Sequence, residues 1–350
     1  MMGRRFLPGL LLVLATSAAA SDDGADIRPP GQIPDQFELP DEYVFNGVTA
    51  DYVGTRDTTG FERDSLRLGA MLHYASSCEF VSLGGSRDEF RQQDWTRIVD
   101  SVVVQGRRVN RLTAEGITGR LAVTANTAHP QWHGEAVWNL RFGERAGVEL
   151  IANRDAVESM PALDRGILSN FLAASFDYAL TDRLTMIAMP TVRRFTDGNQ
   201  QIGGRAWLVY SLLPRSGLSA ELKAQGFDGH GQPEQLYFNP ETYRKAEAGL
   251  RLRSAWENWR VFAYARLGHE WINGDIEKPT AELGVTARRI FNNGVTVGVQ
   301  FAYSRSSYSD AVQNVNENYG WKMLRVVVVL PFERSKPTSP ENPGERESGP

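Results

Sequence analysis

From residue 43 onward, apolar residues alternate with polar or small ones in segments of about ten residues, separated by turn-forming residues. Because successive side chains of a strand point to opposite faces, this period of two predicts strands with one apolar and one polar face. The clearest segment runs from Trp259 to Trp271. One face would carry Trp259, Val261, Ala263, Ala265, Leu267, His269 and Trp271, and the other Arg260, Phe262, Tyr264, Arg266, Gly268 and Glu270. An apolar row with a tryptophan at each end is typical of a lipid-facing strand, and a charged row is typical of a wet barrel interior.

Four further segments, 132–142, 246–252, 283–288 and 295–304, divide in the same way into an apolar and a polar or charged face. A soluble β-sandwich with one wet face is the competing interpretation. It would not need charges on one face of nearly every strand together with aromatic residues flanking the other. The pattern therefore favours a membrane barrel.

The connections between these segments fall into two kinds, which alternate along the chain. Short turns are expected at 76–77, 143–145, 181–182, 214–215, 257–258 and 292–293, with a longer one around 107–113. Mostly longer polar loops are expected at 55–64, 85–94, 127–131, 155–166, 196–202, 228–242, 273–279 and 308–319. Short periplasmic turns alternating with longer outer loops are typical of outer-membrane barrels. The sequence thus predicts an all-β fold, a transmembrane antiparallel β-barrel of about 16 strands over residues 43–332, with both termini in the periplasm.

The last segment with strand character, Trp321–Phe332, is expected to close the barrel. If Phe332 faces lipid, Val327 and Val329 point inward, where the other strands carry charge. Either an apolar plug packs there, or Pro331 bends the strand and shifts the face near Phe332.

The chain begins with the features of an exported protein. Arg4 and Arg5 precede an apolar run that ends before an A-x-A site at Ala18 and Ala20, which predicts a signal peptide over residues 1–20, cut after Ala20. Residues 21–42 form an acidic, proline-containing leader, and residues 333–350 form a polar tail; both are expected to be disordered. We expect a Gram-negative outer-membrane protein, surrounded by outer-membrane lipid and inserted by the barrel-assembly machinery.

Several functions find no support in composition. Beyond the signal, no apolar run is long enough for a membrane-spanning helix. Cys78 is the only cysteine, so no intrachain disulfide can form. The net charge of -4, without a basic tract, gives no support for nucleic-acid binding.

No cofactor, metal or catalytic residue is expected. The histidines fall mostly on different segments and form no zinc-ligand set. His269 and Glu270 would face opposite sides of one strand. An enzyme at the outer rim, such as a hydrolase, would need a His–acid or His–Ser pair near His129 or His133; no matched acid is evident from the sequence.

Alternation assigns charged and aromatic side chains to the lumen. The acidic candidates are Glu135, Glu149, Asp177, Glu221, Glu247, Glu270 and Glu282. The basic candidates are Arg120, Arg141, Arg205, Lys223, Lys245, Arg251, Arg253, Arg260, Arg266 and Arg288. This mixed, slightly basic set either forms ion-pair ladders that brace the wall or lines a path for a polar polymer. The inward aromatic residues Trp207, Phe227, Phe262 and Tyr264 would suit stacking on sugar rings, although single inward aromatics usually serve packing.

Four loop sequences carry a resemblance to a known family. They are Ser159–Leu163 with Pro161, running into Gly166 and Ile167; Phe195–Asn199 with Asp197, Gly198 and Asn199; Tyr237, Phe238, Asn239 and Pro240; and Tyr308–Asp310. In order and approximate spacing over Asn153 to Phe332, the chain resembles the C-terminal barrel of the poly-N-acetylglucosamine export porin, a relative of cellulose-export barrels. The resemblance implies a sixteen-stranded barrel that lets a growing exopolysaccharide cross the outer membrane during biofilm formation.

The chain departs from that family in two ways. The family carries tetratricopeptide repeats before the barrel, whereas only residues 21–42 stand there in this sequence, so a separate periplasmic tetratricopeptide protein would be needed as a partner. The family's lumen is expected to be acidic for a cationic polymer, whereas the lumen inferred here is mixed or mildly basic. That points toward a neutral or anionic polysaccharide, or toward another role, such as a structural or assembly barrel with a plugged lumen.

Overall fold

The computed structural model describes residues 44–76, 79–110, 113–125, 130–231, 236–256, 258–274, 277–291, 294–310 and 315–335. The predicted signal peptide with its cleavage after Ala20, the leader, Cys78, His129 and the tail from residue 336 lie outside these residues.

The chain forms sixteen β-strands. They are β1 (Val44–Asp57), β2 (Glu62–Ser76), β3 (Glu79–Gln92), β4 (Trp95–Val109), β5 (Gly116–Thr124), β6 (Trp132–Phe142), β7 (Ala146–Ala156), β8 (Leu168–Ala179), β9 (Leu184–Phe195), β10 (Gln200–Leu213), β11 (Leu218–His230), β12 (Thr242–Trp256), β13 (Trp259–Ile272), β14 (Lys278–Ile290), β15 (Thr296–Asp310) and β16 (Val315–Ser335). A short helix, α2 (Met160–Arg165), follows β7, and a 3₁₀ turn, η1 (Pro214–Ser216), follows β10. None of the described helices is long and apolar enough to cross a bilayer.

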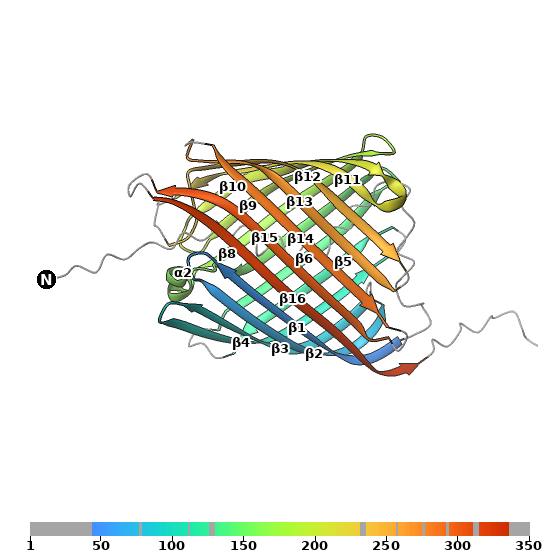
Figure 1. Ribbon diagram of the computed structural model, residues 1–350. Coiled ribbons are helices and arrows are strands. Elements are labelled where there is room, and N and C mark those ends of the chain that lie inside the picture. Colours follow the sequence, from blue (N-terminus) through green and yellow to red (C-terminus); the bar gives the residue numbers. More distant parts are fainter. Residues whose placement is uncertain are drawn as a thin grey trace, which may run out of the picture.

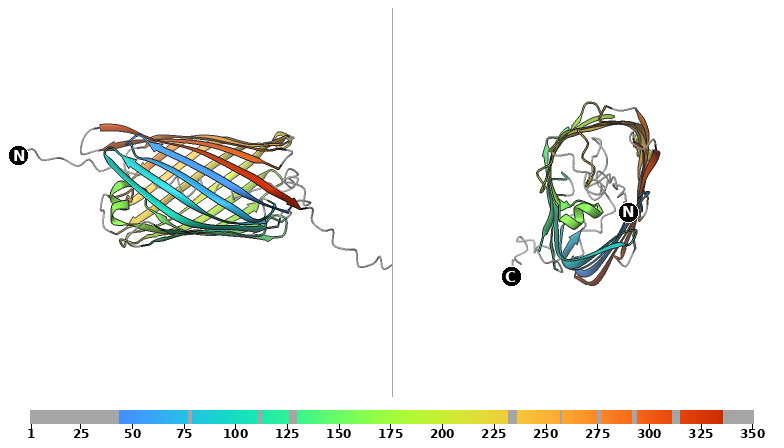
Figure 2. Two further views of the ribbon diagram at one scale, coloured as in Figure 1. Left: turned by 90° about the horizontal axis from the view of Figure 1, so that it is seen from below. Right: turned by 90° about the vertical axis from the view of Figure 1, so that its left-hand side faces the viewer.

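The strands close into one antiparallel barrel (Figure 1). Each strand pairs with its neighbours in sequence, and β16 pairs with β1, so that Arg325 lies opposite Val53. Closure pairs every strand on both sides and leaves no sheet edge. The predicted class and strand count are confirmed, and the barrel is oval in cross-section (Figure 2).

An even number of strands brings the first and last strand ends to the same end of the barrel. We call the end that carries Val44 and Ser335 the terminal end. The opposite end, at the left of Figure 1, carries α2, and we call it the helical end.

The outer wall is apolar. On β6, Trp132, Trp138 and Phe142 are 52%, 50% and 61% exposed, and on β13 Leu267 is 71% exposed. On the inner face of β13, by contrast, Arg266 is 8% exposed. Exposed apolar residues over a whole wall are what a lipid-facing surface requires, and they are far more than a soluble monomer tolerates. The face assignments predicted for β6 and β12 to β15 are confirmed.

The strands extend further than the sequence predicted. The loops expected at 55–64, 85–94 and 308–319 are wrong for most of their length: β1 runs to Asp57, β3 to Gln92 and β15 to Asp310. About ten residues suffice to span the apolar layer, so these longer strands project beyond it. Because both faces of a projecting strand meet water, its apolar–polar alternation fades and it looks like a loop in the sequence.

In the closing strand, β16, the structure shows features of both alternatives offered for the inward-facing valines. Val329 is 8% exposed and packs with Met71 and Phe80, so these three residues form a small apolar cluster on the inner face toward the terminal end. The ladder with β1 also shifts register between Asn46 and Gly47, which faces Pro331. The strand continues to Ser335, three residues beyond the predicted boundary at Phe332.

Candidate functional site

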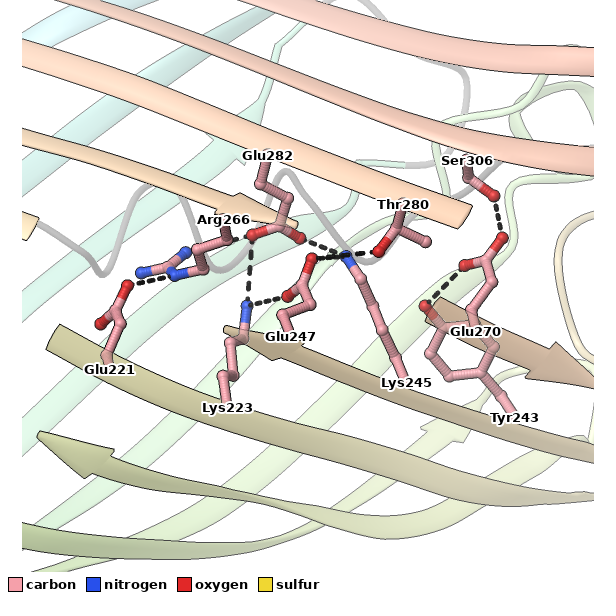
Figure 3. A network of polar contacts seen from close by, with 10 residues as sticks. All are labelled: Glu221, Lys223, Tyr243, Lys245, Glu247, Arg266, Glu270, Thr280, Glu282 and Ser306. Carbon is pink, nitrogen blue, oxygen red and sulfur yellow. Dashed lines mark hydrogen bonds and ion pairs between the residues drawn. The ribbon is translucent and has the colours of Figure 1, made fainter. Parts of the chain in front are cut away.

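Alternating charges cover the lumen face of β11 to β14 (Figure 3). Arg266 of β13 donates from Nε to Glu221 Oε1 and, at 3.1 Å, from Nη1 to Glu282 Oε2. Arg266 and Glu221 are 8% and 3% exposed. Because a buried charge is costly unless it is paired, each of these groups depends on the others.

Lys223 and Lys245 complete this set from β11 and β12. Lys245 Nζ lies 2.7 Å from Glu247 Oε1 and also donates to Glu282 Oε1. Lys223 Nζ lies 3.4 Å from Glu282 Oε2 and 3.6 Å from Glu247 Oε2. We call these six residues the wall cluster: Glu221, Lys223, Lys245, Glu247, Arg266 and Glu282. Its three carboxylates face three cations, so it is electrically balanced and braces the wall.

Glu270 lies next to the wall cluster, on the same strand as Arg266. It is 1% exposed, accepts a hydrogen bond from the Tyr243 hydroxyl at 3.1 Å, and accepts another from Ser306 Oγ. Tyr243 in turn stacks on Phe227, with ring centroids 5.3 Å apart. Phe227 therefore serves packing and does not offer a free stacking face.

A second charged group, which the sequence reasoning missed, lies across the barrel seam. Asp51 of β1 accepts from Arg325 at 3.0 and 3.1 Å and from Arg67 at 3.3 Å. The predictive signal was present, because Arg63, Ser65 and Arg67 alternate with exposed Leu66 and Leu68. Asp51 and Arg67 were not among the predicted lumen residues, because no faces were assigned to the first two strands.

The helical end holds a third charged group, around Arg63 of β2. Arg63 Nη2 donates to Asp88 Oδ1 at 2.7 Å, and Nη1 donates to Glu158 Oε1 in the loop before α2. Nearby, His133 Nδ1 lies 3.2 Å from Asp155 Oδ1. The acid that a rim enzyme would need beside His133 is thus present, contrary to what the sequence suggested.

The loop between β7 and β8 folds into the barrel mouth and carries α2, which lies inside the barrel outline in Figure 2. Ser159 caps α2 by accepting from Ala162 N at 3.3 Å and donates from Oγ to Leu236 O at 2.6 Å. Gly166 ends the helix at φ 65°, a left-handed conformation that glycine adopts without strain. Val157, Ser159 and Ala162 are all 0% exposed. This loop is packed into the mouth and does not extend into solvent.

Three of the four family-like loop sequences meet here. The Tyr237 hydroxyl donates to Asp197 Oδ2 at 2.7 Å and accepts from Asn199 Nδ2 at 2.8 Å. The Tyr237 ring lies 4.5 Å from the Phe195 ring, and both belong to one buried cluster with Val157, Ala162 and Ile167. We call the packed loops 157–167, 196–199 and 236–241 the mouth assembly.

The remaining residues of these sequences fix the mouth assembly to the wall. Gln201 Nε2 donates to Phe238 O at 3.3 Å and to Asn239 Oδ1 at 3.2 Å. Arg97 Nη1 donates to Leu163 O at 2.7 Å. Pro161 lies in the first turn of α2, Gly198 lies in the β9–β10 turn, and Pro240 precedes β12. The fourth sequence is not a loop: Tyr308 and Asp310 belong to β15 and pair with Glu317 and Val315.

Of the other lumen candidates, Arg120 lines the same cavity as Arg63, Arg67 and the His133–Asp155 pair. Glu135 and Arg120 approach to 3.9 Å, and Arg141 donates to Asp177 at 2.7 Å. Arg205 and Trp207 follow one another on the half-buried inner face of β10. The candidates Arg251, Arg253, Arg260 and Arg288 gather near the terminal end on β12 to β14, where Tyr264 also lies on the inner face.

No group of His, Cys, Asp and Glu residues within the described ranges has a metal-binding arrangement. In the ionic groups described above, charged side chains pair with other side chains of the protein.

Neither a protein-family model nor a curated protein sequence matches the chain. Solved structures do match. A bacterial polysaccharide outer membrane secretin is similar over 83% of this chain and 99% of its own, with a TM-score of 0.62 and 12% identity. OccK7 of Pseudomonas aeruginosa (83% and 99% covered, 10% identity) and OccAB1 of Acinetobacter baumannii (87% and 99% covered, 12% identity) both give a TM-score of 0.41. At such identities the likeness to the secretin shows the fold alone, an outer-membrane β-barrel.

Proposed function

We propose that the chain is an outer-membrane barrel that conducts an exopolysaccharide across the outer membrane, as a passive conduit without catalysis. The observation that carries the proposal is the lumen itself. An apolar outer wall encloses an inner face of charged and hydroxyl side chains over many strands, as the interior of a barrel that conducts a polar polymer requires. The fold shared with a polysaccharide secretin supports the same function.

The mouth assembly also supports the proposed export of a polysaccharide. Three sequences that resemble those of the poly-N-acetylglucosamine porin are far apart in the chain yet contact each other through Tyr237, Asp197 and Ser159. Their convergence at one mouth suggests that they act as one structure, narrowing the exit for a polymer. In the proposed orientation the terminal end faces the periplasm, where a separate tetratricopeptide protein would deliver the polymer.

A non-transporting barrel with a plugged lumen is the second candidate, and the buried state of α2 favours it. The two candidates differ in what happens when the plug is removed. A conduit should already conduct ions, and replacing residues 157–167 by a short Gly-Ser link should raise its conductance. A plugged scaffold should stay electrically closed until that replacement is made.

The decisive experiment joins conductance with secretion. The purified full chain is inserted into planar bilayers, and the gene is deleted in its host while extracellular polymer is measured. Conductance together with loss of secreted polymer is the expected result. A closed wild-type barrel whose deletion leaves secreted polymer and biofilm unchanged would refute the export function.

The His133–Asp155 pair meets one requirement of a rim hydrolase. Arg63 and Arg120 both act electrostatically on Asp155, however, so the pair belongs to a larger charged group on the wall. A hydrolase would also need a nucleophile hydrogen-bonded to the other ring nitrogen. Under the conduit proposal, His133→Gln leaves polymer secretion intact.

A further inference from the structure

The terminal end of the lumen is strongly basic. Near the ends of four strands, the inner face carries five arginines, which we call the basic band: Arg107, Arg251, Arg253, Arg260 and Arg288. None of the printed register partners of these arginines is acidic. Acidic residues of the inner face toward this end of the barrel include Glu149, Asp177 and Glu221, and Glu221 is paired with Arg266 of the wall cluster. Asp177 is paired with Arg141 at 2.7 Å. Along the ladder, each arginine of the basic band therefore lies opposite neutral residues or another arginine, whereas Lys223, Lys245 and Arg266 each lie opposite a glutamate.

Two arginines of the basic band are direct neighbours. Arg260 of β13 and Arg288 of β14 are register partners in the antiparallel ladder. Like charges directly opposite each other on one face destabilise a sheet. An anion between two guanidinium groups would remove that repulsion, and the forked geometry of a guanidinium suits a carboxylate or a sulfate.

Aromatic rings stand among these arginines. Phe262 and Tyr264 lie on the same inner face, with ring centroids 5.8 Å apart, and in register with Arg253 and Arg251 of β12. Both rings are half-buried and so still reach the lumen. This combination suits charged sugar units. The apolar face of a sugar ring stacks on an aromatic ring, and the charged substituent of the sugar pairs with an arginine.

The backbone of β14 is shaped to accept one of the rings. Gly284 is the register partner of Tyr264, and a Cβ at residue 284 would come within 2.4 Å of ring atom Cε1. Any larger side chain at this position would displace the ring from the wall. The guanidinium of Arg266 also lies over the same ring, 4.1 Å from the ring centroid.

Open space adjoins the basic band. A cavity of about 290 Å³ is lined by Arg107 and Arg288, and also by Arg67 and Arg325. Asp51 is the carboxylate on this lining, and Arg325 and Arg67 bind it at 3.0 Å and 3.3 Å. The volume is close to the lower end of the range for small-molecule sites, about 300–1,000 Å³. It suits a unit about the size of one sugar.

We propose that the basic band with Phe262 and Tyr264 is a binding site for anionic saccharide units, so that the polymer carried by this barrel is an acidic polysaccharide. The inference rests on the proposed conduit function and names its substrate class. A carboxylated sugar and a sulfated sugar share the required chemistry, and the experiment separates them.

The test uses the full chain in planar bilayers and in detergent. Oligogalacturonate supplies carboxylates, a sulfated oligosaccharide supplies sulfates, maltohexaose is neutral and a chitosan hexamer is cationic. We expect an anion-selective current that is blocked by the acidic probes and far less by the other two. The more effective acidic probe identifies the substituent that the site prefers.

The double variant Arg260→Gln/Arg288→Gln should weaken the block by oligogalacturonate at least tenfold and reduce anion selectivity. Arg260→Lys/Arg288→Lys should keep the selectivity and lose part of the affinity, because lysine keeps the charge without the forked geometry. Arg289→Gln is the matched control, since Arg289 neighbours Arg288 but is exposed on the outer face. It should leave both measurements unchanged.

The outcomes separate the two proposals. Equal block by maltohexaose and oligogalacturonate, with no change in the double variant, overturns the acidic substrate and leaves the conduit intact. If the barrel does not conduct, equilibrium binding of a fluorescent oligogalacturonate in detergent still tests the site. Binding that the double variant does not weaken overturns the site, whereas unchanged polymer secretion after gene deletion overturns the conduit.

Discussion

Ser159→Ala should loosen the mouth assembly without disturbing the barrel. The substitution removes the cap of α2, which costs about 1 kcal/mol. It also leaves Leu236 O, the acceptor of Ser159 Oγ at 2.6 Å, without that bond at a buried site, for about 1 kcal/mol more. A total of about 2 kcal/mol raises the undocked fraction of the loop by about 30-fold.

Hydrogen exchange measures this change directly, because the amides of Gly166 and Ile167 donate to Leu163 O and Ala162 O only while α2 is formed. Their exchange should accelerate by about 30-fold, while amides in the strand ladders stay protected. Ser216→Ala is the matched control: Ser216 Oγ donates to Leu213 O at 3.2 Å in an exposed turn at the terminal end. If the amides of Gly166 and Ile167 exchange at the same rate in Ser159→Ala as in the control variant, Ser159 does not hold the loop in place.

Three further results are expected. Glu282→Gln should lower the free energy of unfolding in lipid vesicles by about 3 kcal/mol, because three buried cations lose a shared carboxylate; the exposed Glu277→Gln should change it by less than about 0.5 kcal/mol. Burial raises the pKa of Glu158 in the docked loop above its ordinary value. The docked loop therefore binds a proton more tightly than the undocked loop. Docking should be strongest below the ordinary glutamate pKa and should weaken as the pH rises through the raised pKa. Exchange of the 157–167 amides, corrected for intrinsic rates, should show this trend in wild type and lose it in Glu158→Gln. Gly284→Val should displace the Tyr264 ring, visible as changed fluorescence of a Tyr264→Trp reporter when the two substitutions are combined.

Much of the wall could be predicted because one local rule governs it. On β13 each residue is either in lipid or in water, so Leu267 and Arg266 reveal their faces without knowledge of any partner. This rule failed for the parts of the strands that extend beyond the apolar layer of the membrane. Beyond the apolar layer both faces of a strand are wet, so Arg63 looked like part of a loop although it continues the inner face of β2.

The pairings inside the lumen could not be predicted, because they depend on barrel closure. Asp51 and Arg325 lie 274 residues apart in the chain and meet only when β16 joins β1. The contact between Tyr237 and Asp197 likewise depends on two loops folding inward over the mouth, a direction that no period in the sequence records. The resemblance identified the residues of these loops, and the structure shows that they pack against each other.

The uneven balance of charge along the lumen bears on how a polymer could move through it. At the wall cluster, Lys245 and Arg266 are already paired with carboxylates, and at the helical end Arg63 is held by Asp88 and Glu158. In the proposal made above, a passing anion is attracted mainly at the basic band, where no register partner of an arginine is acidic. Conduction requires a site favourable enough for entry and weak enough for release. In the proposed orientation, attraction at the periplasmic entrance followed by balanced walls meets both requirements, because an acidic chain is captured once and then advances without a second strong site, pushed by the synthesis behind it.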